Sequence, residues 1–142
     1  MIENPVIHRI ANSEVVIQHF GYWPGFHDAE IRKVTFEANP GYYPAVVFLI
    51  EAFETTRDTD ERGYYRLAKQ CEIELRFTGI KEIDFDGFGH QNVILKMEFD
   101  EQDGDLTCTI DSSVGLDAFI VTQAVEVVSL MLTTTTTLTA PE

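Results

Sequence analysis

A histidine and an aspartate stand next to each other at His27 and Asp28, and no other pair of side chains is better suited to chemistry. Such a pair can hold a metal ion or transfer a proton. A hydrolytic site, however, needs several converging ligands, or a nucleophile with its base. The other histidines, His8, His19 and His90, lack metal-ligand spacing. A metal-dependent hydrolase using His27, Asp28 and His90 stays an alternative, and we favour a role in which the pair bridges backbone groups.

Two acidic segments have the composition of calcium loops. They are Asp84-Phe85-Asp86-Gly87 and Asp100-Glu101-Gln102-Asp103-Gly104-Asp105. An EF-hand loop has glycine at its sixth position and a bidentate glutamate at its twelfth. With Gly87 or Gly104 placed sixth, the twelfth residue is Val93 or Ile110, so neither segment fits. The sequence favours hairpin turns at both places and indicates no metal and no cofactor.

Acidic residues outnumber basic ones throughout the chain. There are 24 Asp and Glu against 10 Lys and Arg, which gives a formal net charge of -14, and no basic residue follows Lys96. This charge opposes binding to nucleic acid or to anionic membranes. It can instead form a negative face that steers a basic protein partner, or it can simply keep the protein soluble. The candidate partner-binding residues are Asp84, Asp86, Asp100, Glu101, Asp103 and Asp105, with Asp84 and Asp86 expected to join the others across a hairpin.

The length of 142 residues fits one domain, and a hydrophobic content of 44% is enough for a core. We expect a single globular domain over residues 1–132 and a Thr-rich strand extension or frayed tail over residues 133–142. Phosphate loops, G-x-S-x-G elbows and H-E-x-x-H helices do not occur in the sequence. Cys71 and Cys108 are not spaced as a metal or redox pair and indicate buried, reduced thiols. With no secretory signal or membrane span visible, these features favour the cytoplasm.

One short helix is expected before the strands. Asn12 or Ser13 can cap it, and Gly21 is placed to end it. From Ala29 to Phe36 apolar residues alternate with polar ones, which predicts a strand, and the alternation slips near Lys33 as at a bulge.

The middle of the chain predicts a hairpin with a long loop. Asn39-Pro40-Gly41 is a turn sequence, and residues 44–54 are apolar almost throughout, as in a central strand covered on both faces. Residues 55–63 are the most hydrophilic segment and are expected to form an exposed loop. Alternation resumes from Tyr64 to Phe77, and a separate short strand is expected over residues 80–85.

Further strands follow at short intervals. Asp86-Gly87-Phe88-Gly89 is expected to turn, and Asp103-Gly104 to join strands over residues 93–99 and 106–111 as a hairpin. Residues 116–132 fit a helix or a strand, and their β-branched residues favour the strand. The predicted fold is mainly β, with six to eight antiparallel strands in a curved sheet or two-layer sandwich and one short N-terminal helix.

The segment Phe20-Gly21-Tyr22-Trp23-Pro24-Gly25-Phe26-His27-Asp28-Ala29-Glu30-Ile31 resembles the F-G-x-W-P-x-F-H-D-A-E-(I/V) motif of the immunity protein fifty family, which is found beside toxin genes in bacterial polymorphic toxin systems. The matching positions are Trp23, Pro24, Phe26, His27, Asp28 and Glu30. Gly25 stands where serine is expected, which puts any role for a hydroxyl there in doubt. The resemblance implies a cytoplasmic protein that neutralises a cognate toxin by binding it, without catalysis.

Within that reading, the motif is expected to support the fold more than to contact a partner. Trp23 and Phe26 would anchor a loop, and Asp28 would satisfy backbone donors. Partner specificity would then lie in the 55–63 segment and on the acidic face. The favoured function is stoichiometric binding by a non-catalytic immunity protein, and a further alternative is an assembly subunit that pairs through an exposed β edge.

Overall fold

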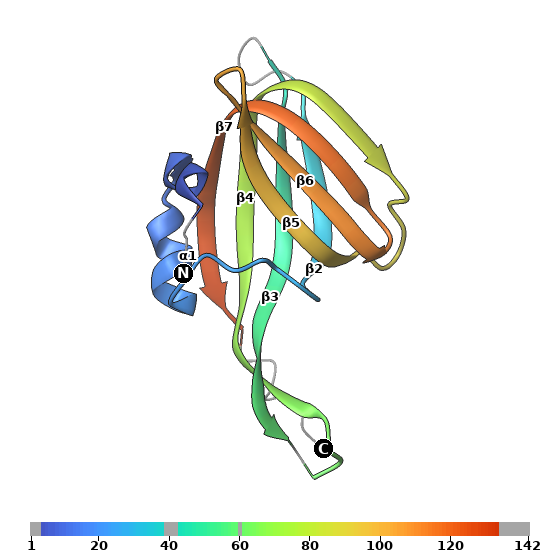
Figure 1. The fold of residues 1–142 in the computed structure, drawn as a ribbon. Helices are drawn as coiled ribbons and strands as arrows, with labels where there is room; N and C mark the ends of the chain where they lie inside the picture. The colour runs from blue at the N-terminus through green and yellow to red at the C-terminus, as the bar shows by residue number, and fades with distance from the viewer. Residues whose placement is uncertain (1–3, 39–42, 60, 134–142) are drawn as a thin grey trace.

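The computed structural model describes residues 4–38, 43–59 and 61–133, which form one sheet of seven strands with one α-helix and one 3-10 helix beside it (Figure 1). In chain order the elements are η1 (Pro5–Arg9), β1 (Ile10–Ala11), α1 (Ser13–Phe20), β2 (Glu30–Glu37), β3 (Ala45–Thr59), β4 (Tyr65–Asp86), β5 (Val93–Gln102), β6 (Asp105–Val114) and β7 (Asp117–Leu132). The prediction of a mainly β fold with six to eight strands and a short N-terminal helix is confirmed.

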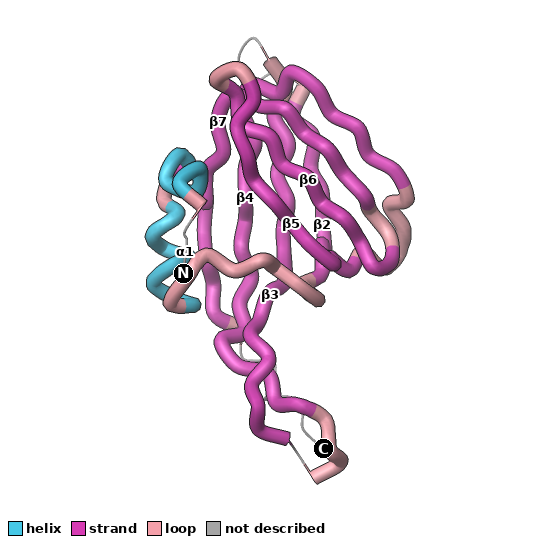
Figure 2. Tube along the Cα trace, in the orientation of Figure 1, coloured by secondary structure: helices cyan, strands magenta, loops and turns pink. Residues whose placement is uncertain are grey.

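The sheet is strongly curved and closes on itself. Its strand order is β1-β7-β4-β3-β2-β5-β6, and β6 pairs with β7 in addition. All pairs are antiparallel except the two-residue strand β1, which runs parallel to β7. Only one pair of residues in the described chain, Glu30 and Val93, is in register between β2 and β5. The seam between these two strands therefore depends on further contacts from the residues just before β2. Figure 2 shows the strands wrapping around the interior, with the helices on one side.

Aromatic rings form a connected path through the core. Phe48 and Phe77 are fully buried, and their ring centroids are 5.4 Å apart. Phe77 stacks on Phe99 with centroids 6.3 Å apart, and Phe99 meets Trp23 edge to face at 5.9 Å. Such ring pairs add to the stabilisation that comes from burial alone. The path therefore couples the Trp23 segment to the centre of the sheet.

The helix α1 spans the expected residues, but Asn12 does not cap it with its side chain, which instead donates from Nδ2 to the Val127 carbonyl at 3.3 Å. It starts at Ser13 after Asn12, and Gly21, at φ +91°, ends it with its N–H donated to the Ile17 carbonyl at 2.7 Å. Val16 and Phe20, one turn apart, are buried, which fixes the face that packs on the sheet. The 3-10 helix η1 was not expected, although Asn4 followed by Pro5 is a start signal, and the Asn4 side chain accepts from the Val6 N–H at 3.1 Å.

Most strand predictions are confirmed by the register. The slip near Lys33 is a register shift between Ile31 and Lys33. Asp103 and Gly104 both have positive φ and connect β5 directly to β6, as a two-residue hairpin turn requires. The ambiguous segment over residues 116–132 is the strand β7, because its pairing with β4 and β6 decides the conformation that its local sequence leaves open.

Two strand boundaries were predicted wrongly. The predicted loop over residues 55–63 is too long: residues 55–59 belong to β3, β4 starts at Tyr65, and the described residues 61–63 form the turn, so a paired hairpin projects from the body (Figure 1). Its polar residues lie on a ribbon exposed on both faces, which erases the alternation that marks a half-buried strand. Residues 80–85 do not form a separate strand but continue β4, because Gly79, at φ +72°, bends the strand without ending it.

Smaller expectations were corrected or lie outside the description. β3 lies between β2 and β4 as expected, but Val47 and Leu49 are only half buried, so its outer face is not fully covered. The Asn39-Pro40-Gly41 turn lies outside the described residues, as does the tail beyond Thr133. Cys71 and Cys108 are buried free thiols as predicted, and burial raises the pKa of Cys71 to about 11.

Candidate functional site

The segment from Gly25 to Ile31 closes the sheet by binding along β5. The Met97 N–H donates to the Gly25 carbonyl at 3.3 Å, and the Asp28 N–H donates to the Ile94 carbonyl at 2.8 Å. The Ile94 N–H returns a bond to the Ala29 carbonyl at 2.8 Å, and the Ile31 N–H donates to Asn92 at 2.8 Å. These four hydrogen bonds hold the seam between β2 and β5, where only one pair of the described residues is in strand register.

His27 and Asp28 lie on the surface of this seam. Nδ1 of His27 donates to the Leu95 carbonyl at 3.0 Å, and its Nε2 is 3.6 Å from Oδ2 of Asp28. The two side chains are 66% and 55% exposed, so they do not form a buried acid-base pair. Asp28 has φ +69°, a conformation that aspartate tolerates better than most residues. Its backbone N–H, and not its carboxylate, makes the described contact with β5.

His90 is not brought to this pair. It lies in the loop between β4 and β5, in a hollow of about 280 Å³ that Arg32 and Phe88 also line. The His27 side chain is hydrogen-bonded to the carbonyl of Leu95, which lies five residues after His90 in the sequence. Within the described ranges, no three His, Cys, Asp or Glu side chains are grouped so that they could hold a metal ion. The three residues of the hydrolase alternative therefore do not converge.

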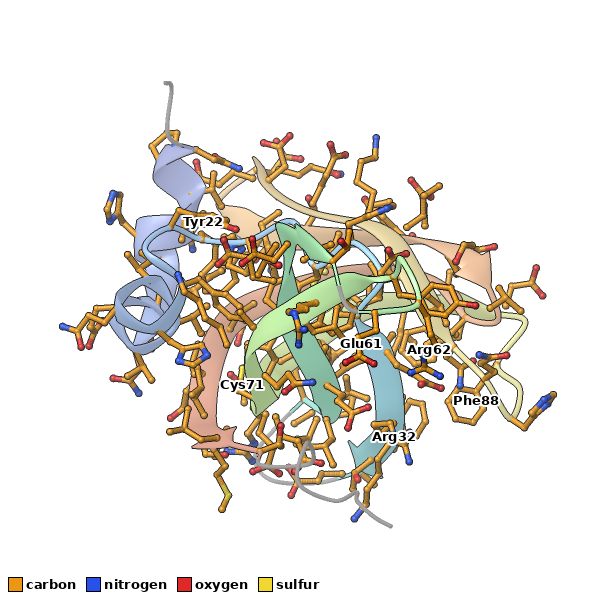
Figure 3. The ribbon with its side chains drawn as sticks, turned by 90° about the horizontal axis from the view of Figure 1, so that it is seen from below. Tyr22, Arg32, Glu61, Arg62, Cys71 and Phe88 are labelled. Atoms are coloured by element: carbon orange, nitrogen blue, oxygen red, sulfur yellow. The ribbon has the colours of Figure 1, made fainter. Side chains whose placement is uncertain are left out.

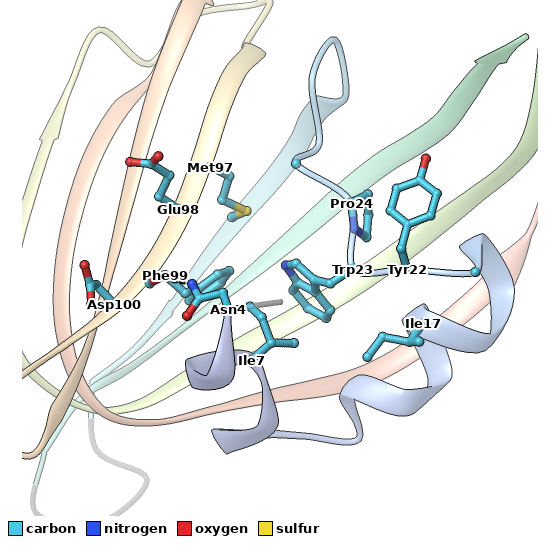
Figure 4. A pocket seen from close by; sticks show the side chains of 12 residues that line it. Asn4, Ile7, Ile17, Tyr22, Trp23, Pro24, Met97, Glu98, Phe99 and Asp100 are labelled. Carbon is cyan, nitrogen blue, oxygen red and sulfur yellow. Dashed lines mark hydrogen bonds between the residues drawn. The ribbon is translucent and has the colours of Figure 1, made fainter. Parts of the chain in front are cut away.

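A groove of about 640 Å³ opens on the other side of the same segment (Figure 4). Figure 3, a view from below, shows Tyr22 on the helix side and Arg32 and Phe88 on the opposite side. Four parts of the chain form this motif groove: η1, the end of α1, the segment following it and β5. Its lining residues are Asn4, Ile7, Ile17, Gly21, Tyr22, Trp23, Pro24, Gly25, Met97, Glu98, Phe99 and Asp100.

Trp23 is held at the centre of the motif groove by two aromatic contacts. Its ring meets Phe26 at 5.7 Å and Phe99 at 5.9 Å, edge to face in both cases. Asn4 ties η1 to the opposite wall, because its Nδ2 donates to the Phe99 carbonyl at 2.9 Å. The apolar floor is thus fixed by buried neighbours, while Tyr22 at its edge remains 46% exposed. Fixed aromatic side chains of this kind are typical anchors in protein interfaces.

The candidate acidic residues fall into two groups. Residues 100–105 surround the turn between β5 and β6, beside the motif groove, whereas Asp84 and Asp86 lie at the end of β4. On β7, Thr122 pairs with Leu106 at the start of β6, but Phe119 pairs with Asp84. Three residues along a strand separate these levels by about 10 Å. The candidate residues therefore lie at two levels of the sheet, which are called the two acidic patches below.

Several of these carboxylates are already paired. Glu101 lies 2.7 Å from Arg9, and Asp105 lies 3.0 Å from Lys81. Oδ1 of Asp100 accepts the Glu101 N–H at 2.9 Å, and in the described part of the chain neither Asp100 nor Asp103 has an ion-pair partner. The carboxylates nearest the motif groove therefore retain net negative charge.

The projecting hairpin, residues 53–70, is called the arm below. Strand β2 pairs with β3 only as far as Glu51 and β7 pairs with β4 only from Cys71, so in the described chain no strand pairs with either edge of the arm, although the Thr133 N–H donates to the Gln70 carbonyl at its base at 3.1 Å. Tyr64 and Leu67 are 66% and 45% exposed, and Arg62 lies over the Tyr64 ring at 5.6 Å. The arm holds four basic and four acidic residues, so the net charge of -14 belongs to the rest of the chain.

Lys69 joins the arm to α1. Its Nζ donates to the Phe20 carbonyl at 3.1 Å and lies 3.1 Å from Oε1 of Glu54. Oε1 of Glu54 is buried without a hydrogen-bond partner in the described residues, so this second contact is an ion pair only. Nε2 of His19 donates to the Lys69 carbonyl at 2.7 Å. The last turn of the helix and the base of the arm thus form one junction, which the sequence did not predict.

Comparison with known families agrees with the motif. The family model described as Immunity protein 50 matches residues 12–132, which includes the motif, every strand from β2 to β7 and the arm. The chain belongs to the immunity protein 50 family. No curated protein and no solved structure matches it significantly. The resemblance suggested by the Phe20–Ile31 segment is therefore confirmed over most of this immunity protein.

Part of the motif groove was missed by sequence reasoning. Trp23, Pro24 and Gly25 were identified as motif positions, but Asn4 and Ile7 were not predicted to face them. These residues lie more than ninety positions before Phe99 in the sequence, and only the closed sheet brings them together. The one local signal was Asn4 followed by Pro5, which marks the start of η1.

In the part of the immunity protein that the structure describes, no helix is long and apolar enough to cross a membrane.

Proposed function

We propose that this immunity protein neutralises a toxin domain in the cytoplasm by stoichiometric binding, without catalysing a reaction. The observation that carries the proposal is the family match over residues 12–132. The geometry supports it, because the conspicuous surface features are a fixed aromatic groove and an exposed arm, and the residues considered for hydrolysis lie apart. Both surface features suit protein contact.

The charge of the chain indicates what kind of toxin surface would bind. A formal net charge of -14 attracts a basic partner from a distance and accelerates association at low salt. Among the candidate residues, Asp100, Glu101, Asp103 and Asp105 lie beside the motif groove and are the better candidates for direct contact. Asp84 and Asp86, on the second patch, would contribute to long-range steering. Specificity for one toxin would come from these patches and from the arm.

Affinity capture from the native host tests this function. Tagged protein is recovered at low and at raised salt, and its partner is identified by mass spectrometry. Light scattering then measures the molar mass of the complex. The proposal predicts one abundant partner that contains a toxin domain in a one-to-one complex, with an association rate that falls as salt rises. Absence of a toxin-domain partner would contradict the function. An association rate independent of salt would remove only the electrostatic part.

A further inference from the structure

The motif groove has an open space where a side chain would fit. Gly25 lies on its wall, and a Cβ added there would meet no atom within 4 Å. The backbone at Gly25 is not in the left-handed region, so the fold does not require glycine at this position. The space is available to a side chain from another molecule.

The chemistry of the wall defines what that side chain is. Ile17 and Trp23, which are partly exposed, offer aliphatic and aromatic surface, and burying that surface against an apolar group from a partner is favourable because it displaces water. A volume of about 640 Å³ lies within the range of ~300–1,000 Å³ that is usual for ligand pockets. An apolar side chain, and not a charged one, suits the floor of the groove.

The border of the motif groove has a different chemistry. Glu98 and Asp100 are exposed on β5, and their carboxylates point away from Trp23, so they lie beside the groove and not inside it (Figure 4). Lys96 lies 3.6 Å from Glu98, but no lysine or arginine is among the described residues that line the groove. A group seated on Trp23 would thus have negative charge next to it, which favours lysine or arginine in the neighbouring positions of the partner.

We propose that the motif groove is the docking site for a toxin segment that inserts an apolar side chain against Trp23 and sets a lysine or arginine beside Glu98 and Asp100. This inference rests on the proposed function and names the surface that performs it. Under it, the motif has two faces: residues 25–31 close the sheet through backbone bonds, while Tyr22, Trp23 and Gly25 face the partner. The second acidic patch, at Asp84 and Asp86, steers the partner but does not touch it.

Blocking the groove is the first test, and the toxin-domain partner recovered by affinity capture is the probe. Gly25→Arg adds a large cation to the groove wall without backbone strain, and Gly89→Arg is the matched control on the β4–β5 loop, where the nearest atom to an added Cβ is 3.8 Å away. The proposal predicts at least a ~100-fold loss of affinity for Gly25→Arg and less than ~3-fold for Gly89→Arg, because a filled hot spot costs several kcal/mol. Thermal unfolding checks that both variants are folded.

Two further matched pairs separate the apolar and charged contributions. Tyr22→Ala should weaken binding about tenfold, while Tyr43→Ala, whose side chain is equally exposed at 45% against 46%, should not. Glu98→Lys with Asp100→Lys should raise the dissociation rate, whereas Asp84→Lys with Asp86→Lys, an equal change in charge, should lower only the association rate. Equal effects within each pair would overturn the proposal.

A spectroscopic signal reports occupancy directly. Trp23 is the single tryptophan of the chain, so labelling with 5-fluorotryptophan gives one fluorine resonance from the groove. The proposal predicts that this resonance shifts when the toxin domain is added and that it stays in place with Gly25→Arg. A one-to-one complex with an unmoved resonance and unimpaired Gly25→Arg would overturn the groove assignment alone. A wild-type chain that neither binds nor protects against the toxin would overturn the proposed function itself.

Discussion

The motif groove and the arm are both exposed, but they are held in place in opposite ways. Four segments distant in sequence build the groove, and its central ring contacts Phe26 and Phe99, which are 4% and 3% exposed. The arm consists of two strands that pair with each other, and the described contacts join it to the helix only through Lys69 and His19. A two-stranded hairpin by itself is marginally stable in water.

Because of this difference, we expect the arm to tolerate substitutions and the groove to keep its side chains in fixed positions. A substitution under the groove is transmitted to the closed sheet, because Gly25 and Met97, which line the groove, are also hydrogen-bonded to each other across the seam. A substitution in the arm meets few neighbours and should alter only the local surface. The comparison indicates that the groove presents a fixed surface and that the arm is the region where the sequence can vary at low cost in stability.

Removing the ring beneath Trp23 should give the largest effect. Phe26→Ala deletes a side chain that is 4% exposed and leaves a cavity, so we expect a loss of about 3–4 kcal/mol in the free energy of unfolding. Tyr64→Ala on the arm, where the ring is 66% exposed, should cost less than about 1 kcal/mol. Urea denaturation measures the loss of unfolding free energy in both variants. Similar losses would contradict the difference between the groove and the arm.

The junction between the arm and α1 should contribute less. Lys69→Met removes the bond to the Phe20 carbonyl and the ion pair with Glu54, and we expect a loss of about 1 kcal/mol, since the lysine is 41% exposed. Amide hydrogen exchange should speed up in the last turn of α1 and at the base of the arm. Arg66→Met on the exposed arm is the control. Unchanged exchange at both places would show that the junction does not hold the arm.

Shortening the arm should cost still less. Glu54 pairs with Ala68, so residues 55–67 can be replaced by Asn-Gly as a two-residue turn that keeps Lys69 and Glu54. Because no residue of the deleted segment whose burial is described is a buried hydrophobic one, the free energy of unfolding should change by less than about 1 kcal/mol. Urea denaturation checks this prediction. A shortened chain that fails to fold would show that the arm is part of the core structure.

A small pH effect is expected at the turn between β6 and β7. The Ser112 N–H and hydroxyl donate to the Asp117 carboxylate at 2.8 Å and 3.0 Å, which lowers the pKa of Asp117 below its ordinary value of 3.8. A lowered pKa in the folded state stabilises the protein above pH 3.8, and that contribution is lost as pH falls through the folded value. The stability difference between wild type and Asp117→Asn should therefore shrink below this pH. A difference that grows on acidification would contradict the assignment, and Ser112→Ala should reduce the effect in part.

Local patterns were enough to predict much of the body of the fold. The helix end was predicted from Gly21, the β5–β6 hairpin from Asp103-Gly104, and part of β4 from the alternation between Cys71 and Phe77. Each of these features depends on residues that are neighbours in sequence. The arm was predicted as a loop because a ribbon exposed on both faces has no hydrophobic period. The closure of the sheet, and with it the wall from Asn4 to Phe99, depends on pairing over long separations that no local pattern contains.

Titration of toxin activity with this immunity protein tests the central claim most directly. The toxin-domain partner recovered by affinity capture is held at a fixed concentration well above the dissociation constant, and its activity is measured as wild type, the shortened-arm variant or Gly25→Arg is added. We predict that wild type abolishes activity at one molecule per toxin and that Gly25→Arg does not neutralise it at that ratio. Inactivation by far less than one equivalent, or full neutralisation by Gly25→Arg, would contradict stoichiometric binding through the motif groove.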